Sequence, residues 1–490
     1  MKLFAAAVCL TGAAHAHTLF TTLHIDGKNQ GDGTCVRQPG DPGTSTAPIY
    51  PLNGEVMACG RQGEKSVPFV CPANGGSTVT FEFREWPAAD HPGSIDESHK
   101  GPCNVYMKKM DNILSDPAAG DGWFKIWEDG YDTATDKWCI DTLIDNNGLL
   151  SVILPTGLPA GEYLIRPELL ALHNAAKGDP QFYHSCAQIF IEDGPDAKLE
   201  IPEKFEISIP GYLSADDPGL TYDIYRSNLP EYPIPGPPVF FPTLSSEAAT
   251  VTKKQEQGAI PDDCLVKNAN WCGEPIKSFS DETGCWDGVT ACWDQADECW
   301  DSVPPSGYAN CDVWQAYCKS MEKACKDQKF DGPVKFTGKE VFAGLPGVIP
   351  EPYGKFDETT VGGGKGDSKP EDNGSVASKT SVAATEPAKA TPTKAVEGEP
   401  VDEEYGEAPE LPQEEDITDD DAEQDEGSDQ SPVEKSPLLK VSEDGRCGGS
   451  TGQTCKGSTF GDCCSKKGRC GRKTRHCACG CQSDFGECRE

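Results

Sequence analysis

The sequence is poor in basic residues and lacks a long apolar run outside its N-terminus. It has 43 Lys and Arg against 80 Asp and Glu, which gives a net charge of −37. A nucleic-acid binder needs a basic face, and anionic membranes attract basic segments, so neither partner is expected. Its mean hydropathy of −0.52 is low for a chain that is globular throughout. Part of the chain is therefore predicted to be disordered.

The only apolar run of note is short and lies at the N-terminus. Residues 3–14 follow Lys2 and run into Ala14-His15-Ala16, which is the pattern of a secretory signal peptide cleaved after Ala16. The run is too short to span a bilayer as a helix. The 24 cysteines also indicate an oxidising compartment. We therefore expect a secreted protein, with residues 1–16 as signal peptide.

Cleavage after Ala16 would make His17 the first mature residue. A free α-amine and the imidazole of the same residue bind one metal ion together, through N and Nδ1. Histidine is a rare residue, so its place at this position indicates a metal site. Further histidines of the same region are candidate partners: His24, His91, His99, His173 and His184.

The mature cysteines fall into three groups, at 35–186, 264–325 and 447–488, with gaps between them. We infer three folded units joined by linkers. The expected organisation is a catalytic unit at 17–243, a linker at 244–258, a Cys-rich helical module at 259–330, a disordered acidic linker at 331–445, and a small disulfide-rich module at 446–490.

The first unit is expected to be mainly β. Val79, Phe81 and Phe83 alternate with polar residues, which predicts a half-buried strand. Residues 149–154, 163–172 and 185–192 are further strand candidates, separated by turn residues. Short strands of this kind predict an immunoglobulin-like or fibronectin-like β-sandwich. Consecutive antiparallel strands would bring His173, Gln181 and Tyr183 to one end of it.

The second unit has cysteines at a seven-residue period. Two trios, 285, 292, 299 and 311, 318, 325, each lie on one face of a helix. An antiparallel helical hairpin would pair Cys285–Cys325, Cys292–Cys318 and Cys299–Cys311, and would leave Cys264–Cys272 as a local loop. Trp286, Trp293 and Trp300 run beside the first trio. They are interpreted as core or interface, with a sugar-stacking surface as the alternative.

The predicted acidic linker holds a run without basic residues. Between residues 399 and 429 there are 16 acidic side chains, and such a run repels itself and stays extended. We interpret it as a solvated spacer, with binding of calcium or a basic partner as the alternative. Asn373-Gly374-Ser375 is an N-glycosylation sequon.

Residues 17–243 resemble fungal lytic polysaccharide monooxygenases of auxiliary activity family 9, formerly glycoside hydrolase family 61. The matching segments occur in the same order along the whole unit. They are His17-Thr18-Leu19-Phe20, Ser98-His99-Lys100-Gly101-Pro102, Gly122-Trp123-Phe124-Lys125-Ile126, Leu170-Ala171-Leu172-His173, Gln181-Phe182-Tyr183, Cys186-Ala187-Gln188-Ile189, Ile209-Pro210-Gly211-Tyr212 and Ile234-Pro235-Gly236-Pro237.

The resemblance implies one copper ion. His17 would bind it through the α-amine and Nδ1, and His99 through Nε2, with Tyr183 as the axial group. His173 and Gln181 would assist catalysis by hydrogen bonding to the activated oxygen species. Three nitrogen donors suit Cu(II), which leads the divalent affinity order.

The resemblance also implies a substrate-facing Tyr232 and a disulfide Cys59–Cys186. Cys35–Cys71 and Cys103–Cys139 are our expectation for the remaining cysteines. An external electron donor and O2 or H2O2 would be required, and the enzyme would oxidise C1 or C4 of a β-1,4-linked glucan. Cellulose is the first expected substrate and chitin the second.

Two hydrolytic enzymes are alternatives to a copper monooxygenase. Zinc prefers a tetrahedral or an open three-ligand site, so a zinc hydrolase is the metal-level alternative. A glycoside hydrolase needs two carboxylates about 5–10 Å apart. Asp90, Asp96 and Glu97 lie near His99 in the sequence, but nothing marks two of them as a pair.

The cysteines of 446–490 resemble the hevein-like chitin-binding pattern of carbohydrate-binding module family 18. The resemblance implies Cys447–Cys464, Cys455–Cys470, Cys463–Cys477 and Cys481–Cys488, and leaves Cys479 over. Ser465 and His476 would contact the sugar. Lys467 and Arg469 stand where this family has aromatic residues, which weakens the expectation of chitin binding because stacking faces are lost.

The sequence thus predicts a secreted copper monooxygenase acting on polysaccharide. A non-catalytic wall-glycan-binding protein and a copper carrier are the alternatives from other classes. Retained polymer binding without activity would favour the first, and tight copper binding without oxidised sugar products would favour the second.

Overall fold

The computed structural model describes residues 17–227, 229–244, 249–352, 358–361, 439–442, 445–448, 451–465, 468–471 and 481–488. The predicted signal peptide, the sequon and the acidic run lie outside these residues. The chain divides into two units, 1–374 and 375–490, and each is described by itself. Within the described ranges, no helix is long and apolar enough to cross a membrane.

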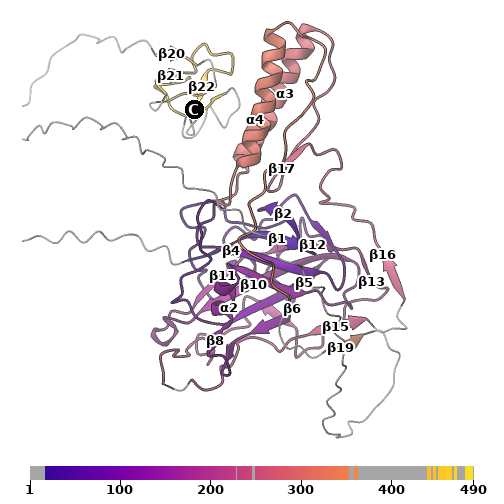
Figure 1. Ribbon diagram of the computed structural model, residues 1–490, viewed down its shortest axis with the longest axis vertical. Helices are drawn as coiled ribbons and strands as arrows, with labels where there is room; N and C mark the ends of the chain where they lie inside the picture. Colours follow the sequence, from indigo (N-terminus) through magenta and orange to yellow (C-terminus); the bar gives the residue numbers. More distant parts are fainter. Residues whose placement is uncertain are drawn as a thin grey trace, which may run out of the picture. The chain divides into compact units, whose positions relative to one another are not determined.

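The N-terminal part of the first unit is a mainly β structure of two facing sheets (Figure 1). One sheet has the order β2-β1-β4-β9, and the other has the order β14-β6-β5-β10-β12-β3, with β11 paired to β10. The first sheet consists of β1 (Leu19–Ile25), β2 (Lys28–Asp32), β4 (Thr78–Arg84) and β9 (Leu149–Ile153). The second consists of β3 (Cys71–Ala73), β5 (Cys103–Met110), β6 (Gly120–Asp129), β10 (Gly161–Ala171), β11 (Gln181–His184), β12 (Ala187–Ile191) and β14 (Ile207–Ile209).

Short elements complete this part. They are α1 (Val56–Cys59), α2 (Cys139–Asp145), the 3-10 turn η1 (Ala175–Lys177), and the strand pairs β7 (Tyr131–Asp132) with β8 (Lys137–Trp138), β13 (Asp193–Pro195) with β16 (Thr250–Thr252), and β15 (Phe241–Leu244) with β19 (Glu358–Val361). Disulfides join Cys35 to Cys71, Cys59 to Cys186, and Cys103 to Cys139.

The hydrophobic core lies between the two sheets. Phe20 of β1 packs edge-on against Phe81 of β4, with ring centroids 5.4 Å apart. The centroid of Phe83 lies 5.8 Å from that of Phe20. Val105 and Ile165 of the second sheet belong to the same cluster. Each fully buried Phe contributes roughly 2 kcal/mol of transfer free energy, so the inward face of β4 anchors the sandwich as its alternation predicts.

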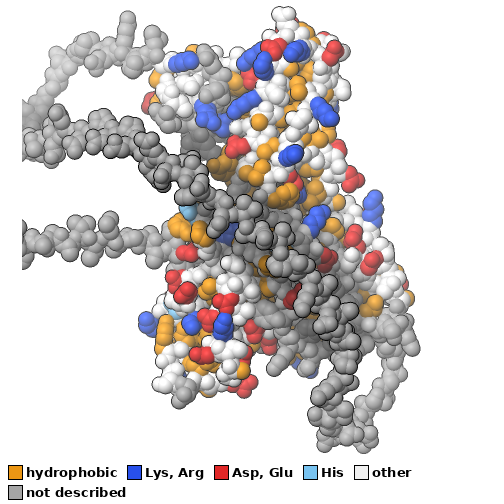
Figure 2. Space-filling view, viewed as in Figure 1, with side chains coloured by type: hydrophobic (Ala, Val, Ile, Leu, Met, Phe, Trp, Pro, Cys, Tyr) orange, Lys and Arg blue, Asp and Glu red, His pale blue; other side chains and the backbone are white. Residues whose placement is uncertain are grey.

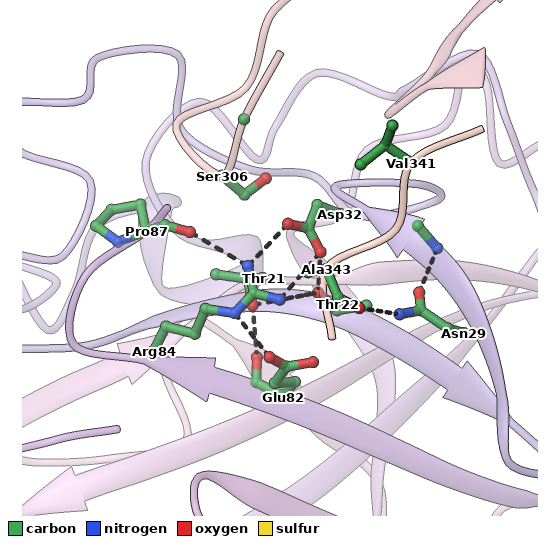
Figure 3. A network of polar contacts seen from close by, with 12 residues as sticks. Thr21, Thr22, Asn29, Asp32, Glu82, Arg84, Pro87, Ser306, Val341 and Ala343 are labelled. Atoms are coloured by element: carbon green, nitrogen blue, oxygen red, sulfur yellow. Dashed lines mark hydrogen bonds and ion pairs between the residues drawn. The ribbon is translucent and has the colours of Figure 1, made fainter. Parts of the chain in front are cut away.

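The other face of β4 is buried as well, which the alternation did not predict. Glu82 is 2% exposed, and His24 and Arg84 both bond to its carboxylate, which compensates its burial. Arg84 also pairs with Asp32 at 2.8 Å (Figure 3). Desolvation of this carboxyl is outweighed by those partners, so its pKa is lowered. The network stabilises strand pairing between β1 and β4, next to the N-terminus.

The helical hairpin predicted for the second group of cysteines is confirmed. Helices α3 (Glu282–Asp301) and α4 (Ala309–Lys326) are joined by Cys285–Cys325, Cys292–Cys318 and Cys299–Cys311. Strands β17 (Val266–Asn268) and β18 (Trp271–Gly273) precede them, and Cys264–Cys272 closes the local loop. The side chain of Asp281 caps α3 by accepting from Gly284 N at 2.8 Å.

The two predicted linkers need correction, because parts of both pack on folded elements. In 244–258, β16 pairs with β13, and Val70 N donates to Gly258 O. The predicted disordered linker does not begin at 331, because Phe336 packs on Trp314 and Tyr317 of α4. Residues 340–343 continue this packing through hydrogen bonds to Lys267, Asn310 and Asn29. The fold of the hairpin module therefore extends well past residue 330.

The C-terminal unit is small and held by disulfides. It contains β20 (Lys440–Val441), β21 (Gln453–Thr454), β22 (Cys463–Cys464) and β23 (Cys470–Gly471). Its described disulfides are Cys447–Cys464, Cys455–Cys470 and Cys481–Cys488, and Cys463 is also disulfide-bonded. Cys477 and Cys479 lie outside the described residues.

Candidate metal centre

Two histidines from distant parts of the sequence meet at one end of the sandwich. His17 precedes β1, where the Oγ1 of Thr18 donates to Arg84 O. His99 lies in the loop before β5, and this loop is shaped by Asp96, which accepts from the backbone N of Ser98 at 2.8 Å. The two imidazole centroids are 6.0 Å apart, with an interplanar angle of 81°. This spacing leaves room for one small ion between the rings.

Strand β11 supplies two more side chains. Gln181 and Tyr183 are two residues apart, so both point to the same side of the strand. The Tyr183 hydroxyl donates to Gln181 Oε1 at 2.7 Å, and its ring centroid lies 5.9 Å from that of His17 and 6.0 Å from that of His99. His173, just after β10, has its ring 4.2 Å from that of His99. The structure thus brings together the five residues predicted for the centre.

Burial keeps these groups uncharged. His99 is 3% exposed, and desolvation together with the neighbouring His173 lowers its pKa to about 4. Desolvation also lowers the pKa of His173. The pKa of Tyr183 is raised, again by burial first. At neutral pH the imidazoles of His99 and His173 are therefore neutral, which is the form that binds metal, and the phenol of Tyr183 is protonated.

The donor set fits a copper ion. The Nδ1 of His99 lies 3.2 Å from the Ser98 hydroxyl, whereas its buried Nε2 makes no hydrogen bond of good geometry among the described residues, although the nearby Gln181 side chain partly offsets the lowering of the His99 pKa. A buried polar atom without a partner is costly, and a metal ion would remove this cost. Imidazole nitrogens suit copper, and an α-amine at His17 would complete the three nitrogen donors.

Sequence reasoning missed two residues beside the centre. Asp179 accepts from Gln181 Nε2 at 3.2 Å and from the Tyr50 hydroxyl through its other oxygen. Because the carboxylate binds the amide nitrogen, the amide oxygen of Gln181 faces Tyr183. Residues 50 and 179 are 129 positions apart, so no local pattern could have revealed this contact.

The remaining candidate histidines lie elsewhere. His24 is fully buried and its Nε2 bonds Glu82 at 3.1 Å, which makes it part of the sheet's polar layer. His184 is buried, with Nε2 near Val56 O. His91 is exposed. None of these three rings stacks with His17 or His99 among the ring contacts of the described residues.

The residues predicted to contact the substrate are Tyr232, Ser465 and His476. The prediction that Tyr232 faces the substrate needs correction. Its side chain is 6% exposed, its hydroxyl donates to Gly219 O, and its ring packs on Trp138 and Tyr222. A buried ring does not present a face to a polymer. In the C-terminal unit, Ser465 is 9% exposed and its Oγ accepts from Arg469 N at 3.1 Å. His476 lies outside the described residues.

Comparison with known proteins identifies the family. The model of auxiliary activity family 9, formerly GH61, matches residues 17–232. AA9 family lytic polysaccharide monooxygenase H of Botryotinia fuckeliana is 39% identical, over 97% of this chain and 96% of its own length. AA9 family lytic polysaccharide monooxygenase C of Aspergillus tamarii is 49% identical, over 66% of this chain and 89% of its own length.

Among solved structures, CvAA9A is similar over 46% of this chain and 98% of its own, with 32% identity and a TM-score of 0.41. The match to the Botryotinia enzyme extends past the sandwich through the hairpin to the C-terminal unit. The chain therefore belongs to auxiliary activity family 9, the lytic polysaccharide monooxygenases, and is an enzyme of that oxidoreductase class.

Proposed function

We propose that this protein is a secreted, copper-dependent monooxygenase that cleaves β-1,4-linked glucan by oxidation, with cellulose or a cellulose-associated glucan as substrate. The observation that carries the proposal is the convergence of His17, His99 and Tyr183, whose ring centroids lie within 6.0 Å of one another around the buried Nε2 of His99. A hydrolase would use paired carboxylates instead. The proposal includes cleavage after Ala16, which would free the α-amine of His17.

His17 and His99 would hold the ion, and Tyr183 would lie beside it. Copper bound there would supply one-electron redox chemistry with O2 or H2O2 for the oxidation of a sugar C–H bond. With O2, two electrons and two protons come from outside, one oxygen atom enters C1 or C4, and the other leaves as water. The hydroxylated carbon then expels the neighbouring glycosidic oxygen, which breaks the chain.

The surrounding side chains orient and protect this centre. Tyr183 stays protonated, so its hydroxyl donates to Gln181 instead of adding negative charge beside the metal. Gln181 is 9% exposed and held by Asp179, so its amide keeps one orientation. Neutral His173 lies beside His99 and has a lone pair free to hold a proton or accept a hydrogen bond.

The C-terminal unit is proposed to bind chitin or another wall glycan, which makes chitin the second candidate substrate. Its disulfides Cys447–Cys464, Cys455–Cys470 and Cys481–Cys488 favour a hevein-like fold. The bonded and poorly exposed Ser465 favours weak binding.

The test is mass spectrometry of soluble products from cellulose and from chitin. Copper-loaded mature protein with ascorbate should release aldonic-acid or 4-keto oligosaccharides that disappear without reductant. His99→Ala should lose most of its copper affinity by calorimetry, whereas His91→Ala, an exposed histidine of the same region, should retain it. Absence of oxidised products on both polymers, with His17 verified at the N-terminus, would refute the proposal in favour of a binding protein.

A further inference from the structure

Helix α3 contains a repeat that its disulfides do not explain. The triplet Cys-Trp-Asp occurs three times at a spacing of seven residues: Cys285-Trp286-Asp287, Cys292-Trp293-Asp294 and Cys299-Trp300-Asp301. The three cysteines are buried and bonded to α4. Core packing accounts for part of the repeat, because Trp293 and Trp300 pack partly buried against the hairpin core. Trp286 is more exposed and is not part of that packing, so its presence in the repeat calls for a separate reason.

The three tryptophans, here called the tryptophan row (Trp286, Trp293 and Trp300), lie along one side of α3. Residues i and i+7 share a face, and residue i+1 lies about 100° around the helix from residue i. The row therefore runs beside the cysteines rather than among them. Trp286 is 37% exposed, whereas Trp293 and Trp300 are partly exposed and also pack against the hairpin core. Figure 2 shows hydrophobic side chains between charged ones on the surface of the hairpin.

The row continues past the helix and includes polar groups between its rings. Tyr308, 52% exposed, lies beside Trp300 with centroids 5.1 Å apart and an interplanar angle of 36°. Thr290 is four residues after Trp286, and Asp297 is four after Trp293, so each lies on the same face between two rings. The Thr290 hydroxyl donates to Trp286 O at 3.0 Å, so towards a ligand it offers its lone pairs. Aromatic and hydrogen-bonding groups thus alternate along the helix.

The spacing of the row matches an extended β-1,4-linked glucan. Seven helical residues advance about 10.5 Å, and two pyranose units of such a chain span about 10 Å. Sugars two apart in this chain present the same face, so each ring would meet an equivalent sugar face. The aromatic rings would cover its C–H bonds, and the carboxylates would accept hydrogen bonds from its hydroxyl groups.

The charge of the helix selects among polymers. Helix α3 carries Glu282, Asp287, Asp294, Asp297, Glu298 and Asp301, and no Lys or Arg. This charge repels anionic polysaccharides and suits a ligand that is rich in hydroxyl donors. A neutral glucan satisfies both the spacing and the charge.

We infer that the tryptophan row is a second binding site for a single cellulose chain, separate from the metal centre. The inference rests on the proposed function for its choice of polymer. It gives the hairpin module a role: holding the enzyme on its substrate between catalytic events.

The test is binding of the full-length, copper-loaded protein to swollen cellulose without reductant, so that no cleavage occurs. Trp286→Ala should weaken the partition constant about fivefold, which is the usual effect of losing one aromatic contact. The double variant Trp286→Ala/Tyr308→Ala should weaken it about 25-fold. Trp286→Phe should restore most of the binding because it retains a ring.

The matched control is Phe342→Ala, another aromatic at 44% exposure that lies outside α3, and it should bind like wild type. Equal binding by Trp286→Ala and wild type would overturn the inference, and so would a loss confined to chitin or chitosan. The initial rate of H2O2 formation with ascorbate should stay unchanged in all variants. Oxidised cellulose products with unaffected binding would refute this site alone, whereas binding through the row without such products would refute only the proposed function.

Discussion

Replacing Asp179 by alanine should slow oxidation without weakening copper binding. Asp179 contacts neither His17 nor His99 in the described contacts, but its carboxylate holds the Gln181 amide at 3.2 Å. The amide has two orientations, which differ by a half-turn. In the observed one, Nε2 meets the carboxylate and Oε1 accepts from Tyr183 at 2.7 Å. The reversed one would place oxygen against oxygen.

The size of the effect follows from these contacts. A hydrogen bond to a charged group contributes about 1.5–3 kcal/mol, so Asp179 favours the observed orientation roughly 10- to 100-fold. Without it, both orientations are similarly populated, and the nearly buried Nε2 loses its partner. We expect a two- to tenfold lower initial rate of oxidised product release from swollen cellulose, and a copper Kd within about twofold of wild type.

A double-mutant cycle tests whether Asp179 acts through Gln181. If Asp179 acts through Gln181, then Asp179→Ala should have no further effect in a Gln181→Ala background. Lys177→Ala, an exposed change in the same loop, is the control and should leave the rate unchanged. The reasoning is refuted if Asp179→Ala slows Gln181→Ala by the same factor as wild type, or if the copper Kd shifts in parallel with the rate.

Three further predictions concern stability. Burial raises the pKa of Asp129 to about 6, so the free energy of unfolding should fall as the pH rises from 4 through 6. The fall should be at most about 3 kcal/mol, and less where solvent screens the carboxylate. Asp129→Asn should remove this fall in urea titrations, and an unchanged pH profile of the variant would contradict the prediction. Arg37 is 1% exposed and donates to Gln188 Oε1 and to two backbone carbonyls. Arg37→Met should therefore lower the free energy of unfolding by about 3–5 kcal/mol in the same urea assay, and a loss below about 1 kcal/mol would disprove the prediction. Replacing Cys103 and Cys139 by serine opens a 36-residue loop, which gives the unfolded chain more freedom and should lower the free energy of unfolding by roughly 4 kcal/mol. The loss is measured as a drop in the urea midpoint, and a drop equivalent to less than about 1 kcal/mol would contradict the prediction.

Local periodicity explains which parts of the fold the sequence could predict. The seven-residue cysteine period specifies both the helical state and the partner of each cysteine, because helix geometry alone fixes the face. The grouping of His173, Gln181 and Tyr183 is predictable for a similar reason, since two consecutive antiparallel strands joined by a short loop return to the same end of the sandwich. In both cases the information lies within a few residues.

Contacts between distant segments explain what the sequence could not predict. The alternation around Phe81 predicted a solvated outer face for β4, yet Glu82 is 2% exposed, paired with His24 and Arg84. The packing of Phe336 on α4, the burial of Tyr232 and the Tyr50–Asp179 contact are of the same kind. Each depends on where another part of the chain folds back, and composition carries no signal for that.

The choice among histidines shows how structure adds to a sequence pattern. An unpaired ring nitrogen is not sufficient to mark a ligand, because the buried Nδ1 atoms of His24 and His184 also have no partner among the described residues. A neutral imidazole tolerates one such nitrogen, since only one of the two carries a proton. At His99, the unpaired nitrogen belongs to a ring that lies within 6.0 Å of two other histidine rings and of Tyr183. Convergence of several neutral donors on one point, rather than any single unsatisfied atom, is what distinguishes a metal centre from a buried histidine.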